Sequence, residues 1–226
     1  AEVTDEGTVL VSGRLLNEIA RSLPNKPVDM ESDHTQVELT CGSARFSLQT
    51  LPVDEYPTLP EMPTQTGLVD ANVFEKAVSQ VVIAAGRDEL LNVFTGVRVE
   101  INGDQLSLQA TDRYRMALKE LTWQPSSPDI EGAVLVPGRV LADTAKSLTS
   151  GKTVTVSLST TESEGEGLAG FIGEGSRGRR EATTRLLNQA FPKVRHLMDV
   201  VGTVTVRVPT ADLLAAVKRV SLVAER

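Results

Sequence analysis

The chain has 226 residues, 40% hydrophobic and 23% charged, a composition typical of a globular protein of one or two domains. No apolar run approaches the roughly 18 residues of a membrane helix, and the single cysteine excludes an intrachain disulfide, so we expect a soluble cytoplasmic protein with no membrane partner. The net charge of −7 argues against a nucleic-acid partner, but bases recur at regular positions in predicted helices, so total charge does not decide the question.

The predicted elements begin with a helix and two strands. Ser12 is the candidate N-cap of the helix, and Gly13 immediately precedes it. The apolar stripe of this helix consists of Leu15, Leu16, Ile19 and Leu23. Alternating polar and apolar residues then predict strands over residues 36–40 and 45–49, with Gly42 in the turn between them.

The next elements are again two helices and several strands. The second of these helices begins after Gly138, and Pro137 stands in the place of its N-cap. The helical stripes are Phe74, Ala77, Val78, Val81 and Ala85 in the first helix, and Val140, Leu141 and Leu148 in the second. The predicted strands cover residues 96–100, 105–109, 153–157 and 203–207. Because such strands bury one face only, we expect an α+β fold with helices packed on outer antiparallel sheets.

The sequence repeats itself at an offset of about 130 residues, which is the length of a whole domain. Residues 9–23 return as residues 134–148, with nine of fifteen positions identical and no gap. Two weaker internal similarities pair residues 51–57 with 186–192 and residues 69–87 with 208–226. The order of these repeated segments predicts tandem similar domains and a chain that begins and ends inside domain copies. The copies are the second half of one domain in residues 1–65, a complete domain in residues 66–202, and the first strand and helix of another in residues 203–226.

The second helix of each copy carries the same base–acid–base row on the face opposite its apolar stripe. The rows are Arg14, Glu18 and Arg21 in one copy and Arg139, Asp143 and Lys146 in the other. A solvated face with weak ion pairs would explain one such helix, but the repetition favours rows directed at a common centre. The bases that would add to them are Lys76, Lys218 and Arg219. Sparse bases without interleaved aromatic residues favour loose, sequence-independent contact with duplex DNA.

Motifs for catalysis or cofactor binding are weak. His34 and His196 belong to no triad or metal pattern, and the glycine motif over residues 165–170 lacks the strand–turn–helix context of a dinucleotide site. The acids of a predicted solvated hairpin tip, which lack the spacing of a calcium loop, are Glu162, Glu164 and Glu166. Cys41 is more simply a small core residue than a nucleophile. We therefore expect no enzyme activity, metal or cofactor.

Five segments carry a resemblance to a known family. They are Ala44–Leu48, Leu51-Pro52 with Tyr56-Pro57, Ala110–Leu118, Val136–Arg139 and Phe191–Arg195. They resemble the bacterial DNA polymerase III beta subunits, the sliding clamps. The sequence of Phe191–His196 is similar to that of actinobacterial members. The resemblance covers essentially the whole chain. It implies the DNA-clamp fold, in which three similar domains per subunit and a head-to-tail homodimer close a ring around duplex DNA.

The resemblance also implies roles for two groups of residues. Family members use as hole-lining bases the positions of Arg14, Arg21, Arg139 and Lys146, and a DNA-contacting loop lies near Arg87. Partners, including the DNA polymerase III alpha subunit and the clamp loader, bind by short peptides in a groove. Its positions here are Phe94, Thr111, Arg115, Met116, Pro192, His196 and Leu197. The chain departs from the family where Arg113 and Tyr114 replace the Gly-His of many relatives, and where His196 replaces Arg.

Two functions of other classes stay open at this point. A tandem-domain scaffold would bind partner peptides without enclosing DNA, and its binding to DNA would not depend on whether the DNA is circular. An enzyme with dispersed carboxylates would lose turnover when acids such as Asp112 were replaced. No paired acids are visible to favour the enzyme, so we expect the non-catalytic clamp.

Overall fold

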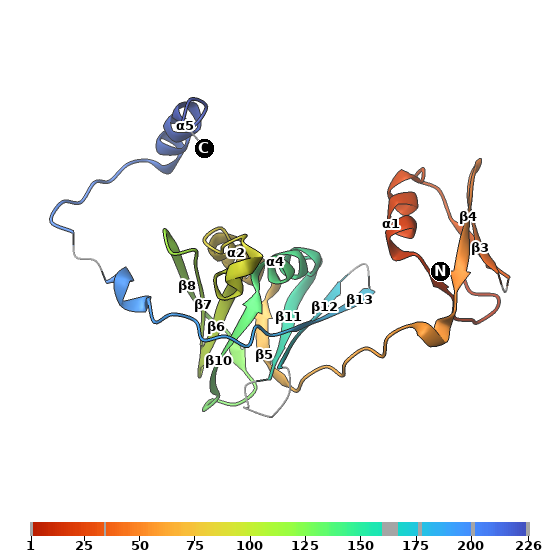
Figure 1. Cartoon of the computed structure of the whole chain (residues 1–226), viewed down its shortest axis with the longest axis horizontal. Helices are drawn as coiled ribbons and strands as arrows, with labels where there is room; N and C mark the ends of the chain where they lie inside the picture. The colour runs from red at the N-terminus through yellow and green to blue at the C-terminus, as the bar shows by residue number, and fades with distance from the viewer. Residues whose placement is uncertain (1, 34, 160–166, 176–177, 200–201, 225–226) are drawn as a thin grey trace. The chain divides into compact units, whose positions relative to one another are not determined.

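The computed structural model describes residues 2–33, 35–159, 167–175, 178–199 and 202–224. The chain forms two compact units, Ala1–Glu61 and Met62–Arg226, and Figure 1 labels most of its helices and strands. Both units combine helices with antiparallel sheets, so the predicted α+β class is confirmed.

The first unit consists of one helix packed on a four-stranded antiparallel sheet. Its elements are β1 (Leu10–Val11), α1 (Gly13–Ser22), β2 (Asp29–Ser32), β3 (Gln36–Cys41), β4 (Ala44–Leu51) and the short helix η1 (Val53–Glu55). The strands lie in the order β1-β4-β3-β2. Helix α1 begins as predicted, because Ser12 Oγ accepts a hydrogen bond from the backbone N–H of Leu15 at 3.4 Å. Ile19 of α1 packs against Leu39 and Leu48 of the sheet.

Two antiparallel sheets and a pair of helices form the body of the second unit. The elements of the first sheet are β6 (Gly96–Asn102), β7 (Gln105–Thr111), β8 (Met116–Thr122) and β10 (Glu131–Pro137). Those of the second sheet are β5 (Gln65–Asp70), β9 (Gln124–Pro125), β11 (Gly151–Leu158), β12 (Leu168–Gly175) and β13 (Gly178–Arg185). The longer helices are α2 (Ala71–Val82), α4 (Gly138–Ser147) and α5 (Thr210–Val220). The short helices are η2 (Glu89–Leu91), α3 (Asn92–Thr95) and η3 (Arg195–Met198).

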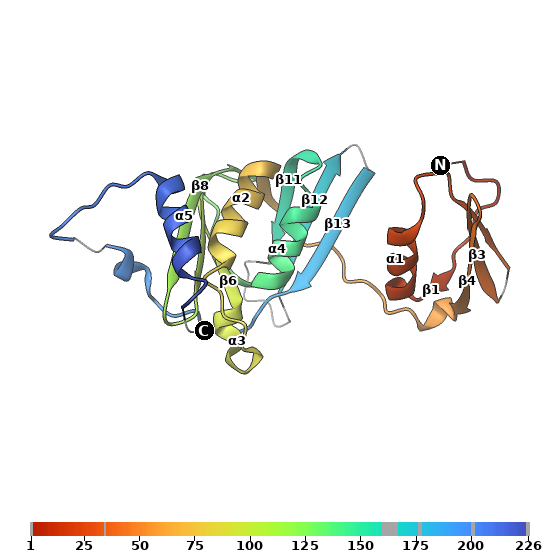
Figure 2. The same cartoon turned by 90° about the horizontal axis from the view of Figure 1, so that it is seen from above.

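Helices α2 and α4 lie side by side over the strands, as Figures 1 and 2 show. The strand orders are β10-β6-β7-β8 in one sheet and β13-β12-β11-β5-β9 in the other. Helix α2 contacts strands of both sheets, so its apolar stripe joins them into one core.

Aliphatic side chains fill this core, as the scarcity of aromatic residues predicts. The two phenylalanine rings of this core, Phe74 of α2 and Phe171 of β12, lie 5.8 Å apart between centroids. Trp123 is buried, and its indole Nε1–H donates to the carbonyl oxygen of Gly103 at 2.9 Å. Gly103 has a φ of +54° in the two-residue turn of the β6–β7 hairpin, a conformation that favours glycine.

The two units contain the same helix and hairpin, as the sequence repeat predicts. Helices α1 and α4 begin and end at positions displaced by 125 residues. In the first unit Leu10 of β1 pairs with Leu51 at the end of β4. In the second unit the equivalent Leu135 of β10 accepts a hydrogen bond from the backbone N–H of Leu187 at 2.8 Å, just after β13. The strand before each helix therefore meets the end of the last strand in both units.

Two residues of the predicted helical stripes are not in the core. Leu15 is 43% exposed and Val140 is 40% exposed, whereas the adjacent Leu141 is completely buried. Successive residues of an α-helix are rotated by about 100°, so two adjacent side chains cannot both point to the centre of the core. The stripe of α4 instead continues through Thr144 and Ala145, which are buried.

The sequence prediction was wrong at two strands. Residues 203–207 form no strand, because no described strand lies beside them to accept their backbone hydrogen bonds. Strand β7 was expected to bury one face, but it is buried at every position after Gln105, because it lies between two strands and under the helices.

Some predicted features lie outside the described residues: the hairpin tip with its three glutamates, the start of the glycine motif at residues 165–166, and His34. Cys41 is fully buried, as expected of a core residue.

Candidate functional site

The exposed face of α4 carries the charged row predicted from the sequence. Arg139, Asp143 and Lys146 are exposed, whereas Leu141 and Ala145 on the other side of the helix are buried. Arg139 and Lys146 are two helical turns apart, about 10 Å along the axis. Neither cation packs in the core, so both side chains are available to the phosphates of a nucleic acid.

Helix α1 carries the same row in the first unit. Arg14, Glu18 and Arg21 are exposed, and Arg14 Nε lies 3.2 Å from Glu18 Oε1. The Arg14 side chain is 90% exposed, so this i,i+4 pair contributes only a few tenths of a kcal/mol and leaves the cation accessible. Each helix therefore brings its two predicted cations to one face.

One cation near the α4 row could not be found from the sequence. Arg180 of β13 donates from Nη1 to the backbone carbonyl oxygen of Ser147 at 2.8 Å, at the C-terminal end of α4. No local motif indicates this contact, because the two residues are 33 positions apart and meet only when β13 is in place. The predicted additional bases Lys76, Lys218 and Arg219 are all exposed on helices.

The turn between β7 and β8 is built around Asp112. Its Oδ1 accepts hydrogen bonds from the backbone N–H groups of Tyr114 at 3.1 Å and Arg115 at 3.0 Å, and its Oδ2 lies 2.9 Å from Arg115 Nε. The hydrogen bond from the Arg115 backbone is the main cause that lowers the pKa of Asp112, outweighing the opposing effect of desolvation. Asp112 is therefore ionised at neutral pH and neutralises the charge of Arg115.

This turn forms one wall of an apolar cavity of about 410 Å³. The apolar cavity is lined by Phe94, Thr111, Arg113, Tyr114, Arg115, Met116, Pro192, Val194, Leu197 and Met198. Six of the seven groove positions implied by the family resemblance thus lie together. The seventh, His196, is exposed on η3 and does not line the cavity. An ion pair between Arg195 and Glu120 holds η3 beside β8.

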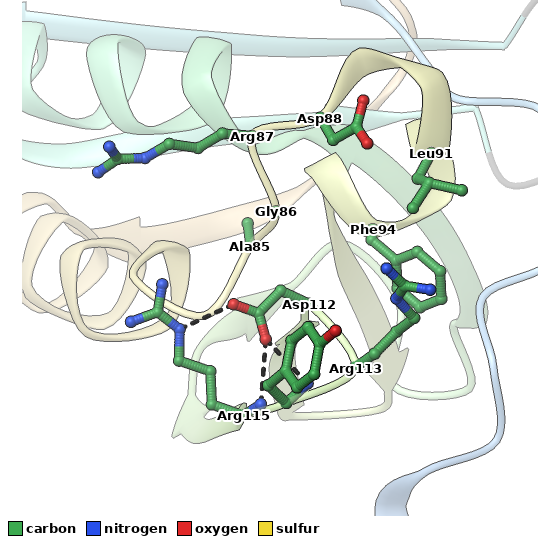
Figure 3. A pocket seen from close by; sticks show the side chains of 10 residues that line it. Ala85, Gly86, Arg87, Asp88, Leu91, Phe94, Asp112, Arg113 and Arg115 are labelled. Atoms are coloured by element: carbon green, nitrogen blue, oxygen red, sulfur yellow. Dashed lines mark hydrogen bonds and ion pairs between the residues drawn. The ribbon is translucent and has the colours of Figure 1, made fainter. Parts of the chain in front are cut away.

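A second cavity of about 470 Å³ is also lined by residues of this turn. This arginine cavity is lined by Ala85, Gly86, Arg87, Asp88, Leu91, Phe94, Asp112, Arg113, Tyr114 and Arg115. Figure 3 shows Arg113 directed toward Phe94 and Arg115 directed toward Asp112. Arg87, predicted near a DNA-contacting loop, lines this cavity and not the charged face of α4. The residues common to both cavities are Phe94, Arg113, Tyr114 and Arg115.

Two further properties of the described part of the chain bear on the site. No group of three or more His, Cys, Asp or Glu side chains is placed to hold a metal ion there. None of its helices has the length and apolar character needed to cross a membrane. What the described residues do present is exposed cations on helices α1 and α4 and a partly apolar groove.

Comparison with known proteins gives two family matches. The family described as DNA polymerase III beta subunit, N-terminal domain, matches residues 1–60. The family described as DNA polymerase III beta subunit, central domain, matches residues 68–193. Among solved structures, the DNA polymerase sliding clamp of Bacillus subtilis has a TM-score of 0.78 at 24% identity and covers 100% of this chain and 59% of its own. A putative beta subunit of Eubacterium rectale has a TM-score of 0.80 at 18% identity, over 100% of this chain and 60% of its own, so the predicted clamp fold is confirmed.

Curated relatives are more similar in sequence. The beta sliding clamp of Streptomyces coelicolor is 53% identical over all 226 residues, and the chain spans 59% of that protein's length. The beta sliding clamp of Micrococcus luteus is 46% identical over all 226 residues, and the chain spans 70% of its length. Both relatives are actinobacterial, which confirms the resemblance noted in the sequence. The chain therefore belongs to the family of DNA polymerase III beta subunits, the bacterial beta sliding clamps.

Proposed function

We propose that this chain is part of a DNA sliding clamp, a non-catalytic ring that encircles duplex DNA and tethers the replicative polymerase to its template. The observation that carries the proposal is the repeated row of cations on equivalent helices of two units, in a chain of the clamp family. Successive domain copies in a closed ring direct equivalent helices toward the same centre. The copies are residues 1–65, 66–202 and 203–226, and the ring is a homodimer.

The proposed DNA contacts are electrostatic and independent of sequence. The hole-lining cations are Arg14, Arg21, Arg139 and Lys146, with Arg87 in a separate loop. A few cations on exposed helix faces attract phosphates only weakly. Each phosphate contact steepens the slope of log affinity against log salt concentration by about 0.9. Weak contacts allow a ring to slide, while its topology prevents release.

We also propose that the apolar cavity receives short peptides of partner proteins. Met116, Pro192 and Leu197 offer apolar contacts, and Arg115 lies at the edge of the same cavity. A cavity of about 410 Å³ accommodates one or two large apolar side chains of such a peptide. The proposed partners are the DNA polymerase III alpha subunit and the clamp loader. His196 is accordingly outside the proposed contact, because it does not line the cavity.

The proposal of a ring is tested by DNA topology. The chain would replace the aligned segment of the Streptomyces coelicolor clamp, to which it is 53% identical over all 226 residues. The chimera would be loaded on a nicked circular duplex by a clamp loader with ATP and isolated on the DNA by gel filtration. We expect it to stay on the circle at moderate salt and to leave when a restriction enzyme linearises the DNA. Retention that does not depend on circularity would contradict the ring and favour a scaffold.

A further inference from the structure

Arg113 holds a backbone conformation that side-chain-bearing residues rarely adopt. Its φ is +81°, and no other non-glycine residue in the described ranges has a positive φ. The surrounding turn enforces this conformation: Arg113 N–H donates to Thr111 Oγ1 at 3.2 Å, and Thr111 Oγ1–H donates to the carbonyl oxygen of Arg115 at 2.8 Å. Glycine would adopt the same φ without the steric conflict of a Cβ atom. A long cationic side chain is therefore kept at a position where it is unfavourable for folding, which points to a role in function.

Two aromatic rings hold the guanidinium of Arg113. Its Cζ lies 5.7 Å from the centroid of the Phe94 ring and 5.8 Å from that of the Tyr114 ring. Both distances are those of cation–π contacts, which position the planar group without using its N–H donors. Tyr114 is 89% exposed, so the rings do not bury the cation. The guanidinium of Arg113 forms no hydrogen bond or ion pair with the described part of the chain, so its donors can bind a ligand.

The position of Arg113 is between the two cavities. Its side chain lines both the apolar cavity and the arginine cavity, together with Phe94 and Tyr114. A peptide anchored by an apolar side chain near Met116 would therefore pass within reach of Arg113, because an extended chain advances by about 3.3 Å per residue.

The charges around this position are not balanced. The arginine cavity is lined by three arginines and two aspartates. Asp112 is paired with Arg115 at 2.9 Å, and no acidic side chain of the described chain forms an ion pair with Arg113. A carboxylate is the ligand that completes such a site, because it accepts two parallel hydrogen bonds from one guanidinium.

We propose that Arg113 is a specificity-determining residue that selects partner peptides with an Asp or Glu within a few residues of their apolar anchor. The inference rests on the proposed peptide groove and adds the chemical class of its ligand. The guanidinium, held by Phe94 and Tyr114, pairs with the carboxylate of the peptide, while the anchor occupies the apolar cavity. Because the cation is held before binding, little side-chain entropy is lost when the pair forms.

The test uses matched fluorescent peptides and the whole chain. Short end-capped peptides would carry a Leu-Phe pair as the apolar anchor and one Asp at each of the neighbouring positions in turn, with an Asn peptide matched to each. We expect at least one Asp peptide to bind about tenfold more tightly than its Asn partner, by fluorescence anisotropy, with a difference that shrinks at high salt. In Arg113→Gln and Arg113→Gly the ratio of the Asp to the Asn affinity should fall to about one.

Three controls separate the inference from the groove itself. Arg45→Gln, a charge removed in the other unit, should keep the preference for Asp; circular dichroism of each variant, together with Trp123 fluorescence for the second unit, shows that it is folded. Equal affinity for every Asp and Asn pair, or a preference retained in both Arg113 variants, would overturn the role of Arg113 and leave the groove intact. Absence of binding by any peptide, or binding unaffected by Met116→Glu, would overturn the groove and with it the inference.

Discussion

The carboxylate of Asp112 organises the turn on which both cavities depend. It accepts two backbone hydrogen bonds and one from the Arg115 side chain, all within three residues. These bonds favour the ionised form and lower its pKa from the ordinary value of 3.8. A group whose pKa is lower in the folded state than in the unfolded state contributes stability that is fully present above the unfolded pKa and is lost as pH falls through the folded pKa.

The pH dependence of stability therefore tests the role of Asp112. At neutral pH we expect Asp112→Asn to lower the free energy of unfolding of the second unit, because the amide cannot pair with the Arg115 charge. The difference from the unchanged chain should begin to shrink as pH falls below the ordinary value of 3.8, and should vanish only below the lower pKa of the folded chain, where the native acid is itself protonated. Urea unfolding followed by the fluorescence of Trp123 reports this unit alone, since the chain has no other tryptophan. A difference that stays constant at every pH would contradict the assignment.

The residues of the groove could not be brought together by local sequence patterns. Phe94, Met116 and Leu197 belong to three separate elements, and their contact depends on how the β7–β8 turn, α3 and η3 pack. Six of the seven positions implied by the family resemblance line one cavity, whereas His196 does not line it. The resemblance could not indicate the role proposed for Arg113, because that residue is a departure from many relatives. The positive φ and the two ring contacts are visible only in the folded chain.

At the scale of elements, helices were easier to predict than strands. Ser12 and the apolar spacing of α1 are local signals, and the structure confirms the cap and the helix. Strand β13 was missed because it is an edge strand with mostly exposed residues, so its sequence shows no polar–apolar alternation. The alternation of residues 203–207 was present, but a strand forms only beside another strand.

Equivalent glycines at the start of α1 and α4 give a matched pair of substitutions. A Cβ atom at Gly138 would lie 2.8 Å from the carbonyl oxygen of Thr95, whereas none of the surrounding atoms lies within 4 Å of one at Gly13. We expect Gly138→Ala to lower the free energy of unfolding by about 1–3 kcal/mol, because the backbone of α3 must move. Gly13→Ala should be neutral or stabilising by up to about 1 kcal/mol, because alanine favours the helix.

Hydrogen–deuterium exchange of peptides that cover each helix measures the two effects separately. Exchange of α4 should accelerate in Gly138→Ala, and exchange of α1 should stay the same or slow in Gly13→Ala. Equal destabilisation by the two substitutions would show that the glycines are needed for local backbone geometry. The close approach of α3 to α4 would then not be the reason for Gly138.

For the whole molecule, the distribution of charge matters more than its sum. The chain carries 30 acidic and 23 basic residues and a net charge of −7, yet α1 and α4 each present two cations on the face opposite the core. A phosphate within a Debye length of about 8 Å responds to these local cations and much less to acids elsewhere on the surface. Net acidity is therefore compatible with the proposed contact with DNA.

Reversing this local charge tests the proposed hole. In the chimera with the Streptomyces coelicolor clamp, we expect Arg139→Glu with Lys146→Glu to shorten retention on circular duplex and to reduce its salt dependence by up to about two units in the logarithmic slope. Arg14→Glu with Arg21→Glu should act in the same way, because the two rows occupy equivalent positions in the domain copies. Both pairs are exposed, so thermal unfolding should change little.

The matched control is Arg45→Glu with Lys119→Glu, which changes the net charge equally but on exposed strand positions. If general repulsion from DNA were the cause, all three double variants would lose retention to the same degree, and the helical rows would have no special role. A ring whose helices face the duplex predicts a different order, in which both helix pairs reduce retention and the strand pair leaves it nearly unchanged. An equal loss of retention in the α1 and α4 variants is the stricter test of the ring, because it is expected only if both domain copies direct the same face toward the DNA.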